Sequence, residues 1–478
     1  MKLTALHSAP TPTTLNDVHA RLTPTPVADL VAVDGPDTIR AALDRARRDG
    51  RRVSVSGARY AMGAQPFRRD SVHLQTSAMD RVLGGDSERG WITVQAGAHW
   101  PSVIAATRTL GGAPPHGWAI AQKQTGADRL SLGGAVSANV HGRGLRLGPL
   151  VDQIEALEVV TPDGELRRVD RASDGALFRH VVGGYGGFGV VHAVTLRLVP
   201  RRKVQRRVVL SSVECVVDEL EAEAQEGALY GDFQFAIDPA DAGFLRRGIR
   251  STYHPVEPDR VIPVGQHALS KGDWMQLLYL AHSAPGRAFE RYAAHYLSTD
   301  GFLYWSDTHQ LGVYVTDYHR ELDRQLGLEH PHTEVITELF VPRSRLVSLF
   351  DAVRDDFRDH RVPVVYGTVR LIQREAESAL PWAREDWACV IFNLCVEHTE
   401  PGLERARSDF RRLIDRALEL DGSYYLTYHR WARDEQLLAA HPALPDVVAE
   451  QQRRDPQGLL VSDWWAHMRR AVGACSDR

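Results

Sequence analysis

QTGADRLSLGGAVSANVHGRGLRLG, residues 124–148, is the most informative segment of the chain. It contains a glycine pair and a run of small residues, followed by Asn139, His141 and Gly142. Such residues let the backbone approach a flat or anionic ligand closely, so that backbone N–H groups can point toward the ligand. The same residue types also build turns in surface loops. The segment alone therefore leaves two interpretations open, and its neighbours decide between them.

Two further glycine clusters flank this segment. RRVSVSG (51–57) alternates like a strand and runs into the loop GARYAMGAQ (57–65), an order that can hold a diphosphate on backbone amides. GGYGGFGVVHAVTLRLVP (183–200) is a third cluster, and it enters a strand. The sequence beyond Pro200 contains no comparable cluster, so the change in composition predicts a domain boundary there.

The remaining patterns predict an α+β protein. GPDTIRAALDRARRDG (35–50) has the apolar spacing of an amphipathic helix, with Asp37 or Thr38 as its N-cap. Residues 333–396 alternate as strand, helix, strand and strand, which favours an antiparallel sheet with helices on one face. We expect domains at 1–200 and 201–420, and an aromatic C-terminal segment (421–478) that returns to the first domain and in which Trp464 and Trp465 form a structural plug.

Composition excludes several classes of function. A net charge of -4 gives no sequence-wide basic field for nucleic acid. The basic cluster at residues 201–207 is interpreted as a solvated surface. Four distant cysteines indicate neither disulfides nor a metal site. The sequence shows no signal peptide and no run of about 18 apolar residues. We therefore expect a cytoplasmic protein without a transmembrane segment.

A nicotinamide dehydrogenase with a Rossmann fold is not favoured. That fold requires G-x-G-x-x-G after the first strand and an acidic residue about 20 positions later. GARYAMG (57–63) has the wrong spacing, and HGRGLRLG (141–148) is a lone GxG without a following helix pattern.

Three motifs in this order resemble the vanillyl-alcohol oxidase / p-cresol methylhydroxylase (PCMH) superfamily of FAD enzymes. They are SGARYAMGAQ (56–65), LGGAVSANVHG (132–142) and GGYGGFGVV (183–191). The tail DPQG (455–458), followed by SDW (462–464), is also similar to the end of these chains. Within the superfamily the likeness is to decaprenylphosphoryl-ribose oxidase and alditol oxidase.

The resemblance implies a two-part PCMH-type FAD-binding domain, a substrate domain with an antiparallel sheet, and FAD as the cofactor. The FAD contacts that it implies are Gly57, Ala58, Arg59, Tyr60, Ala61, Met62, Gly63, Gln65, Gly126, Leu132, Gly133, Gly134, Ser137, Asn139, Gly142, Gly187, Gly189, Val190 and Val191.

The attachment of the cofactor is expected to be non-covalent. Many relatives have a histidine where this chain has Tyr60, and that histidine bonds to the flavin; others use a cysteine near Ala127. Neither residue is present, so the resemblance implies FAD held by contacts alone.

The resemblance also implies hydride transfer to flavin from a C–H beside oxygen or nitrogen, with oxygen or another compound as electron acceptor. The catalytic candidates are His141, beside the central FAD segment, and Tyr428, which falls where the ribose oxidase has a catalytic lysine, with His429 in reserve. A tyrosine with a pKa near 10 needs a cationic neighbour to act as a base at neutral pH.

Candidate substrate contacts lie in the second domain. Tyr366, Thr368 and Arg370 occupy alternate positions of one strand and therefore share a face. Arg370 either binds a carboxylate or phosphate or pairs with Glu338; Asn393 is a further candidate. These residues favour a polar small molecule such as a polyol, a sugar derivative or a natural-product intermediate. Two alternatives remain: an NAD(P)H-dependent flavin reductase of related fold, and a non-catalytic FAD-binding protein.

Overall fold

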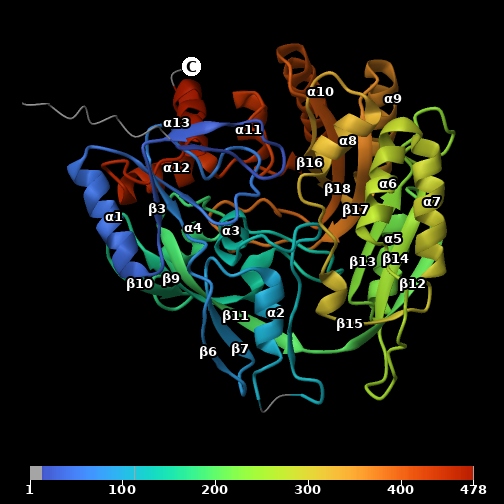
Figure 1. The fold of residues 1–478 in the computed structure, drawn as a ribbon, viewed down its shortest axis with the longest axis horizontal. Coiled ribbons are helices and arrows are strands. Elements are labelled where there is room, and N and C mark those ends of the chain that lie inside the picture. The colour runs from blue at the N-terminus through green and yellow to red at the C-terminus, as the bar shows by residue number, and fades with distance from the viewer. Residues whose placement is uncertain (1–12, 112–113, 477–478) are drawn as a thin grey trace, which may run out of the picture.

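The computed structural model describes residues 13–111 and 114–476, and residues 1–12 of the first expected domain lie outside that range. Figure 1 shows two sheet-containing bodies side by side, with the C-terminal helices above the first. The predicted α+β class is confirmed, since helices and mainly antiparallel sheets alternate along the chain. A short antiparallel pair, β1 (Thr13–Leu15) and β2 (Thr25–Val27), begins the described chain.

The first body contains a small parallel sheet. Its strands are β3 (Asp29–Ala32), β5 (Val72–Gln75) and β4 (Val53–Ser56), in that spatial order. The predicted amphipathic helix is α1 (Pro36–Arg48), which buries Ile39 and Leu43. Its N-cap is Gly35 and not Asp37 or Thr38. Proline is favoured at the first helical position, so the helix begins earlier in the chain than expected.

A larger sheet completes this body. Its order is β10-β9-β11-β7-β6, with β8 paired to the far end of β11. The strands are β6 (Val82–Asp86), β7 (Trp91–Gln95), β8 (Trp118–Ile120), β9 (Ile154–Val160), β10 (Leu166–Asp170) and β11 (Val190–Pro200). The same body contains three helices: α2 (Trp100–Thr107), α3 (Leu132–Ala138) and α4 (Gly175–Val181).

The second body is built on an eight-stranded sheet in the order β15-β12-β14-β13-β17-β18-β16-β19, whose pairs are antiparallel. Its strands are β12 (Lys203–Ser212), β13 (Tyr230–Phe235), β14 (Arg247–Pro255), β15 (Leu303–Trp305), β16 (His332–Pro342), β17 (Val364–Ile372), β18 (Trp387–Glu397) and β19 (Ser423–Tyr424).

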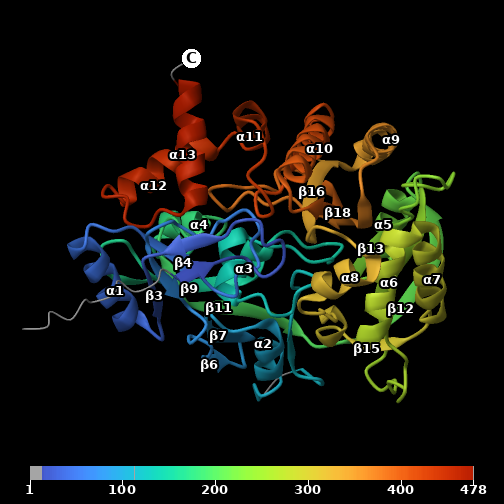
Figure 2. The same cartoon turned by 45° about the horizontal axis from the view of Figure 1, so that its top comes forward.

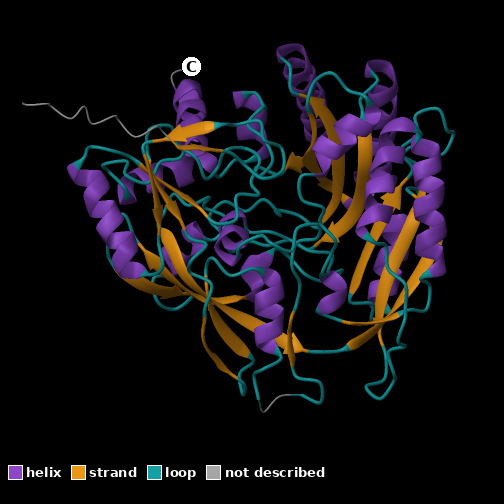
Figure 3. Ribbon diagram, in the orientation of Figure 1, coloured by secondary structure: helices purple, strands orange, loops and turns teal. Residues whose placement is uncertain are grey.

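Helices cover both faces of this sheet, whereas the pattern favoured one face. On one side α5 (Val216–Gln225), α9 (Leu346–His360) and α10 (Glu400–Leu418) supply apolar cover. On the other side Phe289 of α7 (Pro285–Ser298) packs on Val208 and Ile249. Helix α6 (Lys271–Ser283) packs against α7, and α8 (Tyr318–Leu326) packs against α6. Figure 3 shows α6 and α7 beside the strands of this body.

The C-terminal segment returns to the first body. Leu460 forms a parallel bridge to Val53, and α11 (Asp434–Ala440), α12 (Leu444–Arg454) and α13 (Asp463–Ser476) follow β19. Figure 2 shows α12 and α13 above the small sheet. Trp464 and Trp465 are fully buried against Tyr185 and Phe188, as expected for a structural plug.

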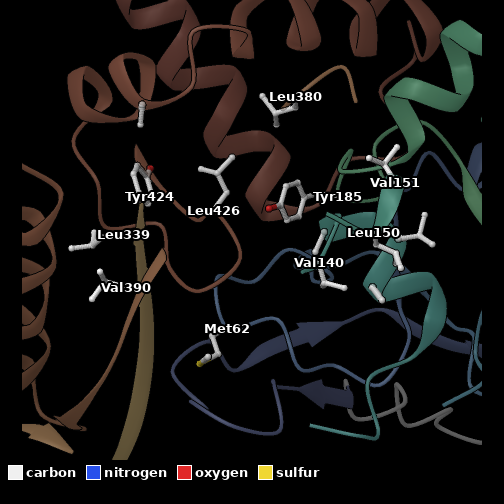
Figure 4. Packing of buried hydrophobic residues seen from close by; sticks show 14 of the residues in the cluster. Met62, Val140, Leu150, Val151, Tyr185, Leu339, Leu380, Val390, Tyr424 and Leu426 are labelled. Carbon is white, nitrogen blue, oxygen red and sulfur yellow. The ribbon is translucent and has the colours of Figure 1, made fainter. Parts of the chain in front are cut away.

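One apolar core joins the two bodies. The same cluster holds Val140 and Tyr185 of the first body and Leu339 and Val390 of the second (Figure 4). A shared core fixes the sheet of the second body relative to the glycine-rich segments of the first. In the described chain, no helix combines the length and the apolar character needed to span a membrane.

Candidate functional site

A cavity of about 730 Å³ opens between the two bodies. Three sets of residues meet in it: the three glycine-rich segments of the first body, one face of the eight-stranded sheet, and the inner sides of α6 and α7. Cofactor and ligand sites usually measure about 300–1,000 Å³ and lie between domains. Position and size therefore mark this cavity as the candidate site.

Most residues predicted to contact FAD line the cavity. These are Gly57, Ala58, Arg59, Tyr60, Ala61, Met62, Gln65, Gly126, Gly133, Gly134, Ser137, Gly189, Val190 and Val191. Gly126 and Gly186 have positive φ angles, and a Cβ on either would project into open space. Bare backbone thus faces the cavity in the central and the third segment, which suits a cofactor that is gripped through main-chain groups.

Five predicted contacts are not among the lining residues: Gly63, Leu132, Asn139, Gly142 and Gly187. Asn139 ends α3 in a left-handed conformation, and its side-chain oxygen accepts a hydrogen bond from the Val151 N–H. A Cβ on Gly187 would lie 2.3 Å from the Trp465 ring, so glycine is needed there for packing. Leu132 belongs to the core.

The other two glycines pack against protein atoms. A Cβ on Gly63 would lie 2.6 Å from the side-chain amide of Gln65, and one on Gly142 would lie 2.6 Å from the carbonyl oxygen of Lys123. These glycines allow tight packing of the loops, and they do not face the cavity.

Three side chains from distant segments form a hydrogen-bonded chain on the cavity wall. The Tyr428 hydroxyl donates to Glu338 Oε1 at 2.6 Å, and Glu338 Oε2 lies 2.8 Å from His141 Nε2. His141 Nδ1 lies 3.0 Å from the carbonyl oxygen of Gly142. Because a carbonyl only accepts, Nδ1 carries a proton, and a further proton lies between Nε2 and the carboxylate.

The electrostatic balance favours an ionised Glu338. Burial raises the pKa of its carboxyl, but the charge and hydrogen bond of His141, with the Tyr428 hydrogen bond, lower that pKa below 4.5 overall. Burial and the neighbouring carboxylate raise the pKa of Tyr428 well above 10, so its hydroxyl stays protonated.

A tyrosine base would need a cation to lower its pKa; the charge of Arg370 does lower the pKa of Tyr428, but burial and the hydrogen-bonded Glu338 carboxylate outweigh it. An ionised tyrosine base is not what this geometry supports. Tyr428 can instead pass its own proton to Glu338 while it receives one, which leaves Glu338 as the final acceptor.

Cys389 lies beside this chain of hydrogen bonds, with its sulfur 3.8 Å from Glu338 Oε2 and 4.0 Å from His141 Nε2. The three residues have the spacing of a metal cluster. However, burial and Glu338 raise the pKa of the thiol well above its usual value, and a thiol is a poor metal ligand until it is deprotonated. We interpret the group as a hydrogen-bonded site.

His429 is not among the lining residues. Its ring is 4% exposed and stacks between Tyr424 and Trp431, with Phe410 at its edge. Burial lowers its pKa to about 3, so it stays neutral. We therefore withdraw His429 as a reserve base; it belongs to the aromatic packing.

The five predicted substrate contacts, Tyr366, Thr368, Arg370, Glu338 and Asn393, all line the cavity. Glu338 and Arg370 are not on neighbouring strands, because β18 lies between β16 and β17. The guanidinium of Arg370 donates to the Thr125 hydroxyl, and among the described residues no carboxylate lies within 4.0 Å of it. Arg370 therefore forms no direct ion pair with Glu338, although its charge helps to lower the pKa of the Glu338 carboxyl.

Several lining residues were missed from the sequence, including Arg143, Arg206, Asp232 and Gln234. The sequence of β13 could have revealed Asp232 and Gln234, because Tyr230, Asp232 and Gln234 alternate there with small or apolar residues. Arg206 belongs to the basic cluster interpreted as a solvated surface, yet it is only 7% exposed.

Comparison with known proteins identifies the first body. Residues 27–170 match the family described as FAD binding domain. This part of the chain is an FAD-binding domain of the PCMH type. The predicted superfamily and the predicted FAD cofactor are thereby confirmed. The match lies within the first body and includes two of the three cavity-lining segments. The third segment, residues 183–191, lies beyond it, beside the FAD-binding domain in the same cavity wall.

The similar proteins are dehydrogenases and oxidases according to their names. L-galactono-1,4-lactone dehydrogenase 1 of Oryza sativa subsp. japonica is 27% identical over 44% of this chain and 33% of its own length. L-gulonolactone oxidase of Bos taurus is 26% identical over 41% and 42%. Cytokinin dehydrogenase 8 of Oryza sativa subsp. indica is 29% identical over 44% and 42%. The matches span less than half of these relatives.

Proposed function

We propose that this protein is an FAD-dependent oxidoreductase that oxidises a C–H bond beside an oxygen or nitrogen of a polar small molecule. The observation that carries the proposal is the chain Tyr428–Glu338–His141, which stands in the same cavity as the FAD-lining segments. Bound FAD would supply the hydride acceptor and the means of transferring electrons to oxygen or another acceptor. The names of the relatives support this class of reaction.

The protein's own part is to orient the substrate and remove a proton. The substrate hydroxyl or amine gives its proton to the Tyr428 oxygen as Tyr428 passes its proton to Glu338. The His141 ring, held by the Gly142 carbonyl, fixes the Glu338 carboxylate in position. His141 and Glu338 are buried, at 4% and 3% exposed, so water competes little for these hydrogen bonds.

The polar side chains that the eight-stranded sheet presents to the cavity indicate a polar substrate. Tyr366, Thr368, Arg370 and Asn393 present hydroxyl, guanidinium and amide groups to the cavity, and the side-chain oxygen of Asn393 is buried without a partner. A polyol, sugar derivative or hydroxylated natural product would satisfy such groups. The lactone substrates in the names of two relatives are consistent with an oxygen-rich molecule.

We also propose that FAD is bound without a covalent link. Tyr60, which stands where the family resemblance implies a linking histidine in related enzymes, lines the cavity, and burial raises the pKa of its hydroxyl. A protonated phenol is a weak nucleophile toward the flavin. Ala127, which also lines the cavity, has no nucleophilic group.

The experiment is an anaerobic screen of the FAD-loaded protein against polyols, sugar acids, lactones and amines, in which loss of the visible flavin absorption reports reduction of the cofactor. Bleaching by one of these classes supports the proposal. Bleaching by NADPH alone would establish the reductase alternative, and no bleaching by any reductant class would favour a non-catalytic FAD protein.

A further inference from the structure

The far end of the cavity, away from Glu338, is lined by buried polar groups without partners. They come from β12, β13 and the segment after the central glycine cluster, and all belong to lining residues. The atoms are Arg206 Nε, Arg143 Nε, Asp232 Oδ1 and Gln234 Oε1. Burying such atoms unpaired costs free energy, so native structures usually satisfy them with protein, water or ligand.

Arg206 has no counter-charge. Its guanidinium stacks 4.2 Å from the Tyr296 ring centre and contacts the hydroxyls of Ser251 and Tyr304. In residues 13–111 and 114–476 no carboxylate lies within 4.0 Å of it. Asp232, the carboxylate at this end of the cavity, is already paired with Arg143 at 3.2 Å. A buried cation without an anion is unfavourable unless a ligand supplies one.

The groups together define the chemistry of that ligand. Two guanidinium groups face one carboxylate, which leaves one positive charge to neutralise. The free oxygens of Asp232 and Gln234 accept hydrogen bonds, and hydroxyl groups would supply the donors. Aromatic rings of Tyr253 and Tyr296 form the walls. An anionic group that also carries hydroxyls fits this set.

Sheet register places this end far from the proton acceptor. Gln234 pairs with Thr368, Thr368 with Ile391, and Ile391 with Glu338. Neighbouring strands lie about 4.8 Å apart, so these three steps separate Gln234 from Glu338 by about 14 Å. Arg206 lies two strands farther along the sheet, beyond β14. A ligand that reaches both ends is elongated.

We propose that Arg206, Asp232 and Gln234, with Arg143, form a second binding subsite that holds an anionic, hydroxyl-bearing group of an elongated substrate. This inference rests on the proposed function, because it assumes that oxidation occurs near Glu338 and Tyr428. The substrate class is accordingly a hydroxylated carboxylate or phosphate whose anion lies remote from the oxidised carbon.

Anaerobic titration calorimetry of the FAD-loaded protein tests this subsite through binding and not through activity. The probes are gluconate, its uncharged counterpart sorbitol, and inorganic phosphate. Wild type is compared with Arg206→Met and Gln234→Leu. The matched control is Arg207→Gln, since Arg207 is the adjacent arginine of β12, with a half-exposed side chain near Glu223 and Glu226. Melting temperature and FAD content verify that each variant is folded.

We expect gluconate to bind wild type more tightly than sorbitol does. Arg206→Met should weaken gluconate and phosphate binding by about 10- to 100-fold, the usual loss for a charged hydrogen bond, and Gln234→Leu should weaken gluconate by about 2- to 10-fold. Arg207→Gln should bind as wild type does. Preference for gluconate over phosphate identifies a carboxylate ligand, and the reverse preference a phosphate.

Any of three results would overturn the proposed subsite. These are equally tight binding of gluconate and sorbitol, no heat from either anion on titration, and equal effects of the Arg206 and Arg207 variants. Its failure is separate from failure of the proposed function. If anions bind through Arg206 but no alcohol or amine bleaches the flavin, the oxidoreductase proposal fails alone. If bleaching occurs but anion binding is independent of Arg206, the subsite fails alone.

Discussion

Replacing Glu338 with glutamine removes the negative charge from the centre of the Tyr428–Glu338–His141 chain with almost no change in shape. Glutamine can still accept from Tyr428, but its amide cannot take up a proton. It also gives the His141 ring no anion to pair with. The substitution therefore separates proton acceptance from packing and cofactor binding.

The expected loss of activity follows from that role. A positioned acid or base contributes about 10²- to 10⁴-fold to a rate, so kcat of Glu338→Gln should fall by that factor. KM should change much less, because the neighbouring Thr368 and Arg370 remain in the cavity. Stopped-flow reduction of the flavin under anaerobic conditions measures the step directly.

Glu334→Gln is the matched control. Glu334 is a buried carboxylate on the same strand that also contacts a tyrosine and a histidine, Tyr318 and His282, but it is not a lining residue of the cavity. Both variants should lose stability, and only Glu338→Gln should lose the reductive step. Wild-type flavin reduction in folded, FAD-loaded Glu338→Gln would refute the assigned role of Glu338.

Three further outcomes are expected. Tyr428→Phe should reduce the rate of flavin reduction by about 10-fold or more while FAD content stays unchanged, and an unchanged rate would remove Tyr428 from the proton path. Gly187→Ala should lower the melting temperature, at a cost of about 1–3 kcal/mol, because the new methyl group meets Trp465; an unchanged melting curve would contradict this packing. Since the folded pKa of Glu338 lies below 4.5, its ionic contribution to stability is complete above about pH 4.5 and is lost as the pH falls through the lowered value. Urea unfolding of wild type and Glu338→Gln should therefore converge in acid, and a difference that stays constant down to the lowest pH at which both proteins fold would count against the ion pair.

Local patterns predicted much of the fold. The strand and helix pattern of residues 333–396 predicted β16, α9, β17 and β18, and apolar spacing in residues 35–50 predicted α1. The glycine clusters predicted the cofactor-binding segments, because backbone that approaches a ligand closely favours glycine and other small residues. Exact contacts were less predictable, since a glycine that packs against a tryptophan, such as Gly187, looks the same in sequence as one that faces a ligand.

Pairings across long sequence distances could not be predicted. Tyr428, Glu338 and His141 meet only because three separate segments join at the cavity, and no local pattern reports strand order. For the same reason β18 between Glu338 and Arg370 was missed. Burial of Arg206 beneath Tyr296 depends on α7, which a run of basic residues does not reveal.

The most direct test of the central claim is a visible absorption spectrum of the purified protein, repeated on the supernatant and pellet after acid precipitation. The structure predicts flavin bands that move into the supernatant, because the described cavity offers backbone and a protonated Tyr60 but no linking histidine or cysteine at the expected positions. Bands that stay with the pellet would contradict non-covalent binding, and a protein that shows no bands even after FAD is added would contradict the account as a whole.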